Sequence, residues 1–173
     1  SLKAFLSCTN ELLKPEAFND YCPNGLQVCG CDTVKKLVAG VTASQALIDR
    51  AIEEGADALL VHHGFFWKGE DPCIVGMKHR RIEALIKNDI SLIAYHLPLD
   101  AHPVMGNNAQ LARLLDLTVT GGLEPNNPHS VGNIGRLAAP MSAEAFSQRV
   151  ANVLGREPLL IKGGEHAIET IGW

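Results

Sequence analysis

Residues 37–64 read LVAGVTASQALIDRAIEEGADALLVHHG, and their pattern is the strongest fold signal in the chain. Leu37–Val41 and Ala58–Val61 are short apolar runs without polar alternation, which is typical of strands buried on both faces. Between them, Ser44 is a suitable N-cap for an amphipathic helix over Gln45–Glu54. A strand, a helix and a strand in this order predict two parallel strands joined by a crossover helix.

The same alternation continues on both sides of this segment. The other expected elements are a helix over Leu2–Leu13, a short strand over Leu26–Val28, a helix over Lys78–Lys87, a strand over Ile90–Tyr95 and a helix over Asn107–Leu117. Pro15 is expected to end the first helix, since proline cannot continue the helical hydrogen-bond pattern. The predicted fold class is therefore α/β, with a largely parallel sheet flanked by helices.

The composition changes after residue 120. Gly121–Gly135 is rich in Gly, Asn and Pro and is interpreted as a loop or linker. The expected elements beyond it are a strand over Arg136–Ala139, a helix over Ser142–Leu154 and strands over Leu159–Ile161 and Ala167–Ile171. We therefore expect a first α/β lobe over residues 1–120, then a linker and the start of a second α/β lobe over residues 121–173. Because Trp173 ends the chain inside an apparent strand, part of that second lobe is expected to be absent.

The composition narrows the classes of function. The chain has 173 residues with 15 Lys and Arg against 19 Asp and Glu, a net charge of −4, and 5% aromatic residues. This balance counts against nucleic-acid binding, which relies on a basic surface or a stacking platform. A hydrophobic content of 46% is that of a globular protein, and no segment predicts a membrane span. The N-terminal residues predict a helix rather than a signal peptide, so the expected location is the cytoplasm.

The five cysteines are odd in number and form no CxxC pair. We interpret them as reduced, mostly structural thiols, with a thiolate metal site formed by the three that lie close together as the alternative. The five are Cys8, Cys22, Cys29, Cys31 and Cys73, and the three close ones are Cys22, Cys29 and Cys31.

Histidines follow two of the predicted strands. His62 and His63 come after one strand, and a segment containing His96, Asp100 and His102 comes after the next. Open parallel sheets bind ligands beyond the carboxyl ends of their strands, and imidazole with carboxylate suits Zn, Fe or Mn. We predict a divalent-metal site with His62, His63 and Asp100 as ligands. His96 is expected to orient these ligands or to act as a general acid, and His102 is a further candidate ligand. The alternative is a hydrogen-bonded histidine cluster that closes the end of the sheet.

Several longer motifs resemble a known family, the NGG1-interacting-factor-three-like proteins. This family is also labelled dinuclear metal centre proteins or GTP cyclohydrolase 1 type 2 homologues. The resemblance is dense between residues 20 and 108 and looser up to Trp173. It rests on DYCPNGLQV at Asp20–Val28, GVTAS at Gly40–Ser44, VHHGFFWK at Val61–Lys68, HLPLDAHP at His96–Pro103 and GNN at Gly106–Asn108.

The resemblance implies two α/β lobes, two divalent metal ions per subunit in the cleft between them, and a toroidal homohexamer. The adjacent histidines of the family match His62 and His63, and its carboxylate ligand matches Asp100. The family adds a His and a Glu from a C-terminal segment that lies beyond Trp173. Its name suggests a metal-dependent hydrolase that acts on a nucleotide-like small molecule, with the metals activating water. The alternative is a non-enzymatic metal-binding or regulatory, partner-binding ring protein.

Two further features border the predicted site. Phe65–Trp67 is an aromatic cluster in an aromatic-poor chain, and it is either core or a wall for a flat ring at the metal site. Pro23–Gly25 is either a plain turn or a loop that shapes the site. The chain has no GxSxG elbow and no plausible Cys–His pair, so no protein nucleophile is expected.

Overall fold

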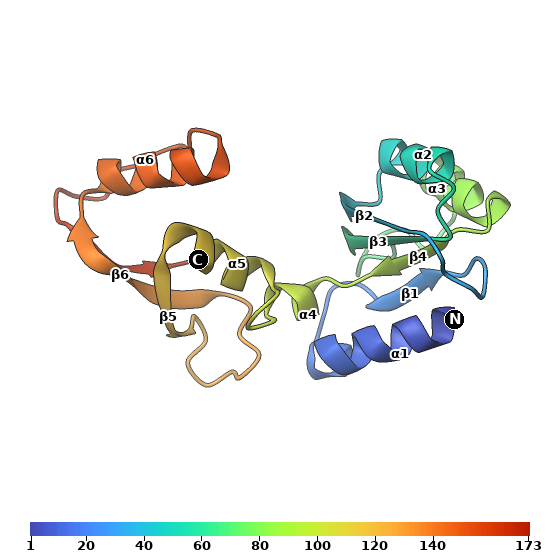
Figure 1. Ribbon diagram of the computed structural model, residues 1–173, viewed down its shortest axis with the longest axis horizontal. Helices are drawn as coiled ribbons and strands as arrows, with labels where there is room; N and C mark the ends of the chain where they lie inside the picture. The colour runs from blue at the N-terminus through green and yellow to red at the C-terminus, as the bar shows by residue number, and fades with distance from the viewer. The chain divides into compact units, whose positions relative to one another are not determined.

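The computed structural model describes residues 1–173, which form two compact units, Ser1–Leu99 and Asp100–Trp173 (Figure 1). Each unit contains one sheet. The predicted lobe boundary at residue 120 stays a prediction, because a lobe of the family need not coincide with a compact unit of this chain.

The sheet of the first unit is largely parallel, as predicted. Its strands are β1 (Gly25–Val28), β2 (Leu37–Thr42), β3 (Ala58–His63) and β4 (Ser91–Ala94), in the order β1-β4-β3-β2. Strands β2, β3 and β4 are parallel, and β1 pairs with β4 in the antiparallel sense. The helices are α1 (Leu2–Leu13), the 3-10 turn η1 (Pro15–Ala17), α2 (Gln45–Glu53) and α3 (Gly76–Lys87), and α4 (Leu97–Asp100) runs from the first unit to the first residue of the second.

Helices cover both faces of this sheet, which explains the continuous apolar runs. Figure 1 shows α2 and α3 on one face and α1 on the other. Leu59 and Val61 pack with the α2 and α3 core, whereas Ala58 belongs to the cluster that α1 forms with the opposite face. Successive residues of a strand face opposite sides, so a strand buried on both sides has no polar position.

The second unit is a smaller antiparallel sheet with two helices. Its elements are α5 (Asn107–Leu115), β5 (Leu117–Gly122), β6 (Asn133–Met141), α6 (Ala143–Leu154) and β7 (Ile168–Gly172), with strand order β5-β6-β7. Its core is small and centres on Leu115, Leu117 and Leu137. Ser142 caps α6 through a hydrogen bond from the Ala145 N–H.

Two expectations in this unit are wrong. Leu159–Ile161 is not a strand: it pairs with no neighbour, and Leu159 is 87% exposed. An apolar run becomes a strand only where another strand accepts its backbone hydrogen bonds. Conversely, β5 falls where the end of a helix and a linker were expected, because its residues pair with β6 despite their two glycines.

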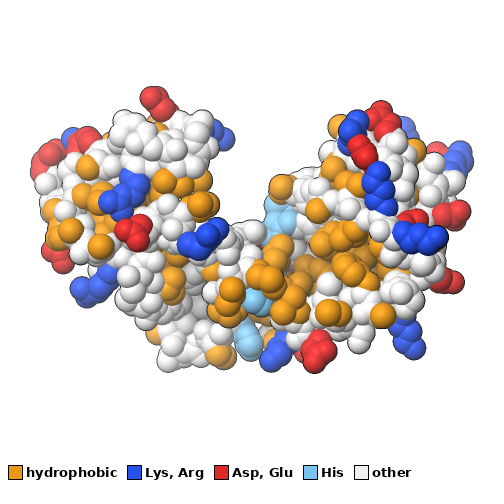
Figure 2. All heavy atoms as spheres, viewed as in Figure 1, with side chains coloured by type: hydrophobic (Ala, Val, Ile, Leu, Met, Phe, Trp, Pro, Cys, Tyr) orange, Lys and Arg blue, Asp and Glu red, His pale blue; other side chains and the backbone are white.

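The surface carries mixed charge. Figure 2 shows acidic and basic side chains interspersed on the face drawn, without one extended basic patch. No helix of the structure combines the length and the apolar character that crossing a bilayer requires.

We predict that Leu59→Ala lowers the free energy of unfolding of the first unit by about 2–5 kcal/mol, because it leaves a cavity in a close-packed core. Leu59 is fully buried at 0% exposure. Urea unfolding followed by circular dichroism measures the change. The matched control is Leu12→Ala, at a leucine 48% exposed, which should cost less than about 1 kcal/mol. Equal losses in the two variants would contradict the two-faced packing of β3.

Candidate metal centre

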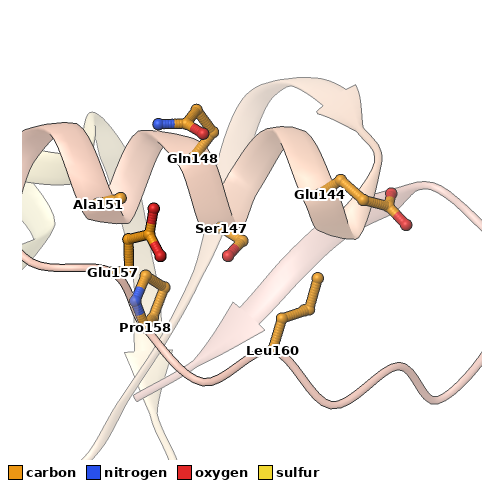
Figure 3. Close-up of a pocket in the computed structure, with 7 residues that line it drawn as sticks. All are labelled: Glu144, Ser147, Gln148, Ala151, Glu157, Pro158 and Leu160. Atoms are coloured by element: carbon orange, nitrogen blue, oxygen red, sulfur yellow. The ribbon is translucent and has the colours of Figure 1, made fainter.

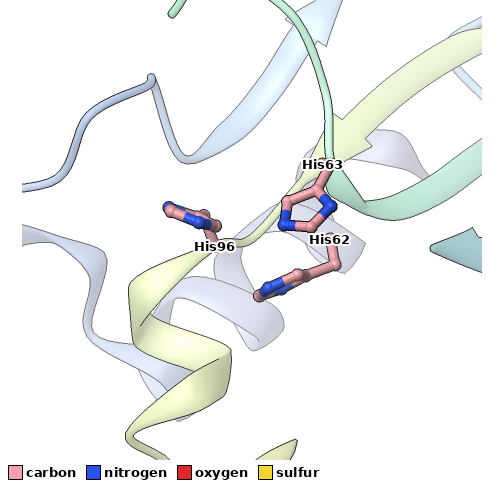
Figure 4. Close-up of side chains that lie close together, drawn as sticks. All are labelled: His62, His63 and His96. Carbon is pink, nitrogen blue, oxygen red and sulfur yellow. The ribbon is translucent and has the colours of Figure 1, made fainter. Parts of the chain in front are cut away.

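Three histidine rings lie together at the carboxyl edge of the first sheet. His62 and His63 are the last residues of β3, and His96 follows β4 closely, as Figure 4 shows. The His62 ring centroid is 4.5 Å from that of His63 and 5.0 Å from that of His96, and the His63 and His96 centroids are 5.5 Å apart. One ring nitrogen from each side chain lies within 4.8 Å of the other two.

Residue 64, which follows these histidines, is a glycine in a place where neighbouring residues approach its backbone closely. A Cβ at Gly64 would lie 2.1 Å from Gln27 Oε1 and 2.9 Å from Ala94 Cβ, closer than any side chain tolerates. Gln27 Oε1 in turn accepts a hydrogen bond of 2.7 Å from the Phe65 N–H. The exit of β3 is therefore fastened to β1, which orients the two adjacent rings.

Hydrogen bonds fix the orientation of two of the rings. His62 Nδ1 donates to the backbone carbonyl of Tyr95 at 3.0 Å, and His96 Nδ1 donates to Asp20 Oδ1 at 2.7 Å. Because a carbonyl oxygen only accepts, the proton of neutral His62 is on Nδ1 and its Nε2 lone pair points elsewhere. A histidine that ligates a metal usually donates its other N–H in this way. Thr42 Oγ1 lies 3.4 Å from His63 Nδ1.

Asp20 is the site residue that sequence reasoning missed. Only 4% of its side chain is exposed, and His96 is 13% exposed. Its carboxylate also accepts hydrogen bonds from the backbone N–H groups of Tyr21 and Leu97 and from the amide of Asn24. Burial by itself raises the pKa of Asp20, but the bonds from His96, Asn24 and the two backbone groups outweigh it and leave the pKa below its usual value.

The turn before β1 therefore shapes the site, in favour of the functional interpretation of Pro23–Gly25. Asn24 Oδ1 accepts a hydrogen bond of 2.8 Å from the backbone N–H of His96. The available sequence signal was the motif that contains Asp20 and Asn24, but nothing in their spacing indicated a contact with a residue more than seventy positions away.

A second group of side chains that could hold a metal ion consists of Asp20, Cys22 and His96. Burial, and then the negative charge of Asp20, raise the pKa of the Cys22 thiol to about 11. A thiol ligates as the thiolate, so this environment disfavours it. Asp20 is already occupied by four hydrogen bonds, and the histidine cluster is the better donor set.

The residues of the aromatic cluster Phe65–Trp67 differ in their surroundings: one belongs to the core, and another borders the histidines. Phe65 is buried at 6% exposure and belongs to the core under α2 and α3. Trp67 instead lies beside the histidines, with its ring centroid 5.0 Å from His96 in an edge-on arrangement and 5.9 Å from His63. Its indole N–H donates to the Gly64 carbonyl, which fixes the ring as a wall of the site.

The remaining predicted residues belong to the second unit. Asp100 ends α4, and its Oδ1 accepts a hydrogen bond of 2.8 Å from the Asn107 amide. His102 Nδ1 accepts from the backbone N–H groups of Val104 and Met105 at 3.2 and 3.1 Å, so it organises a turn. The role of Asp100 as a ligand with His62 and His63 stays a prediction.

The donor set fits a borderline divalent ion. Three imidazole nitrogens around one tetrahedral ion at about 2.1 Å lie roughly 3.4 Å apart, which is comparable to the spacing of at most 4.8 Å between the ring nitrogens of this cluster. Neutral imidazole suits Zn, Fe and related ions, and a carboxylate added to the set suits Mn as well. The arrangement leaves room for further ligands, since three protein donors do not fill a coordination sphere.

Cavities in the second unit lack such a donor set. One of about 210 Å³ lies between α6 and the segment after it, and Figure 3 shows its lining residues, which include Glu144 and Glu157 but no histidine or cysteine. A hydrogen bond from Lys162 lowers the pKa of Glu144 to about 2. The histidine cluster of the first unit is therefore the better candidate site.

Comparison with known proteins identifies the family. The sequence profile of the Duf34/NIF3 (NGG1p interacting factor 3) family matches residues 1–173, so the chain belongs to this family. It is 54% identical over 173 residues to a GTP cyclohydrolase 1 type 2 homolog of Pseudomonas aeruginosa, covering 100% of this chain and 68% of the relative. It is 56% identical over 166 residues to the homolog of Vibrio cholerae, covering 95% of this chain and 66% of the relative.

The fold agrees with this membership. The solved structure of protein ybgI, described as of unknown function, superposes with a TM-score of 0.91 at 48% identity, covering 99% of this chain and 68% of that one. The resemblance that the sequence motifs carry is thereby confirmed. The chain spans about two thirds of the length of the curated relatives it matches.

We predict that His62 and His96, in their neutral forms and without metal, carry the proton on Nδ1. Free histidine in water favours the other tautomer, but the Tyr95 carbonyl and the Asp20 carboxylate accept from Nδ1 here. Long-range ¹⁵N–¹H spectra at a pH where the rings are neutral distinguish the two tautomers. His102 is an internal control, because its Nδ1 accepts from two backbone N–H groups and its proton must be on Nε2. The same tautomer at all three residues would contradict the site geometry.

Proposed function

We propose that this protein binds divalent metal ions through the imidazoles of His62, His63 and His96, with Asp100 as a carboxylate ligand. The single observation that carries the proposal is the cluster of three imidazoles, two of which already donate their Nδ1 protons. The predicted orienting role for His96 becomes that of a direct ligand, and Asp20 takes over the orienting role. Two ions per subunit, as the family resemblance implies, would need the additional His and Glu of the C-terminal segment.

We further propose that the metal centre serves a hydrolase that acts on a nucleotide-like small molecule. When bound, a divalent ion supplies Lewis acidity, which polarises an electrophile and makes water nucleophilic near neutral pH. The chain's own residues orient the site: Asp20 holds the His96 ring, and the Trp67 ring lies edge-on beside it. The names of the relatives, GTP cyclohydrolase 1 type 2 homologs, support this reaction class.

The second candidate is a non-enzymatic metal-binding or regulatory protein. It is favoured by the close, mutually packed histidine rings, which would also serve a purely structural ion. A homohexameric ring and a cytoplasmic location belong to both versions of the proposal. The number of open coordination positions separates the two versions, because a structural ion is saturated by protein ligands and a catalytic one is not.

Removing a ligand should abolish metal binding, whereas removing its orienting partner should only weaken it. We expect His62→Ala, His63→Ala and His96→Ala to lose the bound ion, and Asp20→Asn to weaken its affinity by about 10- to 100-fold. Metal content by mass spectrometry and competition with a chelator measure both effects. The matched control is His79→Ala, at an exposed histidine of α3, which should keep full metal content. Full metal content in His96→Ala would return His96 to the orienting role.

We predict that the metal-loaded protein hydrolyses nucleotides or cyclic amides and that a chelator stops the reaction reversibly. The physical reason is that the thiol beside His96, Cys22, has its pKa raised to about 11 by burial and is not activated, so the reaction would depend on metal-activated water. Turnover is followed by chromatography of the products, before and after metal is added back. Saturated metal content with no turnover on either substrate class would favour the binding-protein candidate.

A further inference from the structure

A cavity lies beside the histidine cluster, against α3. It encloses about 270 Å³, and its walls include His63 and Trp67 on one side and Met77, Lys78 and Arg81 of α3 on the other. His63 therefore faces both the proposed metal position and this cavity. A molecule held in the cavity would therefore lie against one of the proposed metal ligands.

Three charged side chains line the cavity, and two of them neutralise each other. Lys78 Nζ lies 2.5 Å from Glu70 Oε1, donates to the Asp71 carbonyl at 3.1 Å, and lies 5.1 Å from the centroid of the Phe66 ring. The Lys78 side chain is only 16% exposed. The positive charge of Lys78 and the negative charge of Glu70 therefore neutralise each other in this ion pair.

Arg81 is the third charged side chain that lines the cavity. It forms no ion pair in the structure, and its Nε is buried without a hydrogen-bond partner, the only buried side-chain nitrogen or oxygen of the chain in that state. Buried donors in native proteins are almost always paired, and leaving one unpaired costs free energy. A guanidinium on the wall of a cavity, with no carboxylate of its own, is the arrangement that recognises an oxyanion of a ligand.

We propose that this cavity binds the oxyanionic group, a phosphate or a carboxylate, of the molecule that reaches the metal centre, with Arg81 as its partner and the Trp67 ring as the adjacent wall. The identification of this molecule as the substrate rests on the proposed function. The chemistry restricts the substrate to an anionic compound, because the cavity offers a cation, Arg81, that no carboxylate of the protein pairs with. A neutral compound of the same shape would leave Arg81 unpaired.

The neighbouring residue supplies a matched control. Arg80 lies on the same helix with the same charge but is exposed and does not line this cavity. A general effect of basic charge on anion binding would be shared by the two arginines, whereas a built site would depend on Arg81 alone.

The test is a calorimetric titration of the metal-free protein with phenyl phosphate, benzoate and benzyl alcohol, which share a ring and differ in charge. We expect phenyl phosphate or benzoate to bind, and Arg81→Gln to weaken that binding by about 10- to 100-fold, the effect of losing a charge-assisted hydrogen bond. Arg81→Lys should recover part of the affinity because it keeps the charge, and Arg80→Gln should change it less than about twofold. The better of the two anions identifies the group as phosphate or carboxylate.

Metal content measured on the same variants separates the two proposals. Arg81-dependent anion binding in a protein that takes up no metal would overturn the metal centre and leave the anion site standing. Normal metal content with no anion binding, or with equal losses in Arg81→Gln and Arg80→Gln, would overturn the anion site alone. Benzyl alcohol that binds as tightly as the anions would overturn it as well, since the cavity would then be a simple apolar pocket.

Discussion

The parallel pairing of β3 with β4 is the constraint on which the site depends. Val61 is in register with Ala94, so the two strands end at the same edge of the sheet. The Tyr95 N–H donates to the Val61 carbonyl at 3.1 Å. The carbonyl of Tyr95 then accepts from His62 Nδ1. The backbone hydrogen bonds between the two strands are thus followed by one from a side chain. The backbone after β4 orients a histidine of β3.

A second restraint comes from the turn before β1, which fastens the exit of β4. Asp20 binds the ring of His96 and the backbone N–H of Leu97, and Asn24 binds the backbone N–H of His96. A buried carboxylate is tolerated only when its oxygens are fully hydrogen-bonded, which is the case here. These bonds hold both the ring and its backbone, so a substitution at Asp20 acts on the geometry of the site rather than on one contact.

Local pattern predicted much of the first unit and little of what connects distant segments. The apolar run of β3 predicted a buried strand, which the structure contains, and the two histidines and the glycine after it predicted a candidate site at its end. Asp20 could not be found in this way, because its role comes from a contact across the sheet and not from any periodicity. Leu159–Ile161 shows the opposite error: its residues favour a strand, but hydrogen bonding to a neighbour decides whether a strand forms.

Electrostatic repulsion would couple the cavity to the proposed metal centre. Imidazoles ligate a divalent ion as neutral groups and the Asp100 carboxylate would cancel only one of its two charges, so the proposed site keeps a net positive charge. Arg81 would add a second positive charge in the adjoining cavity, and like charges at close range repel unless an anion lies between them. Glu70 cannot serve as that anion, because Lys78 already neutralises it. An anionic ligand that contacts both cations would therefore relieve the repulsion, which makes the arrangement selective for charge as well as for shape.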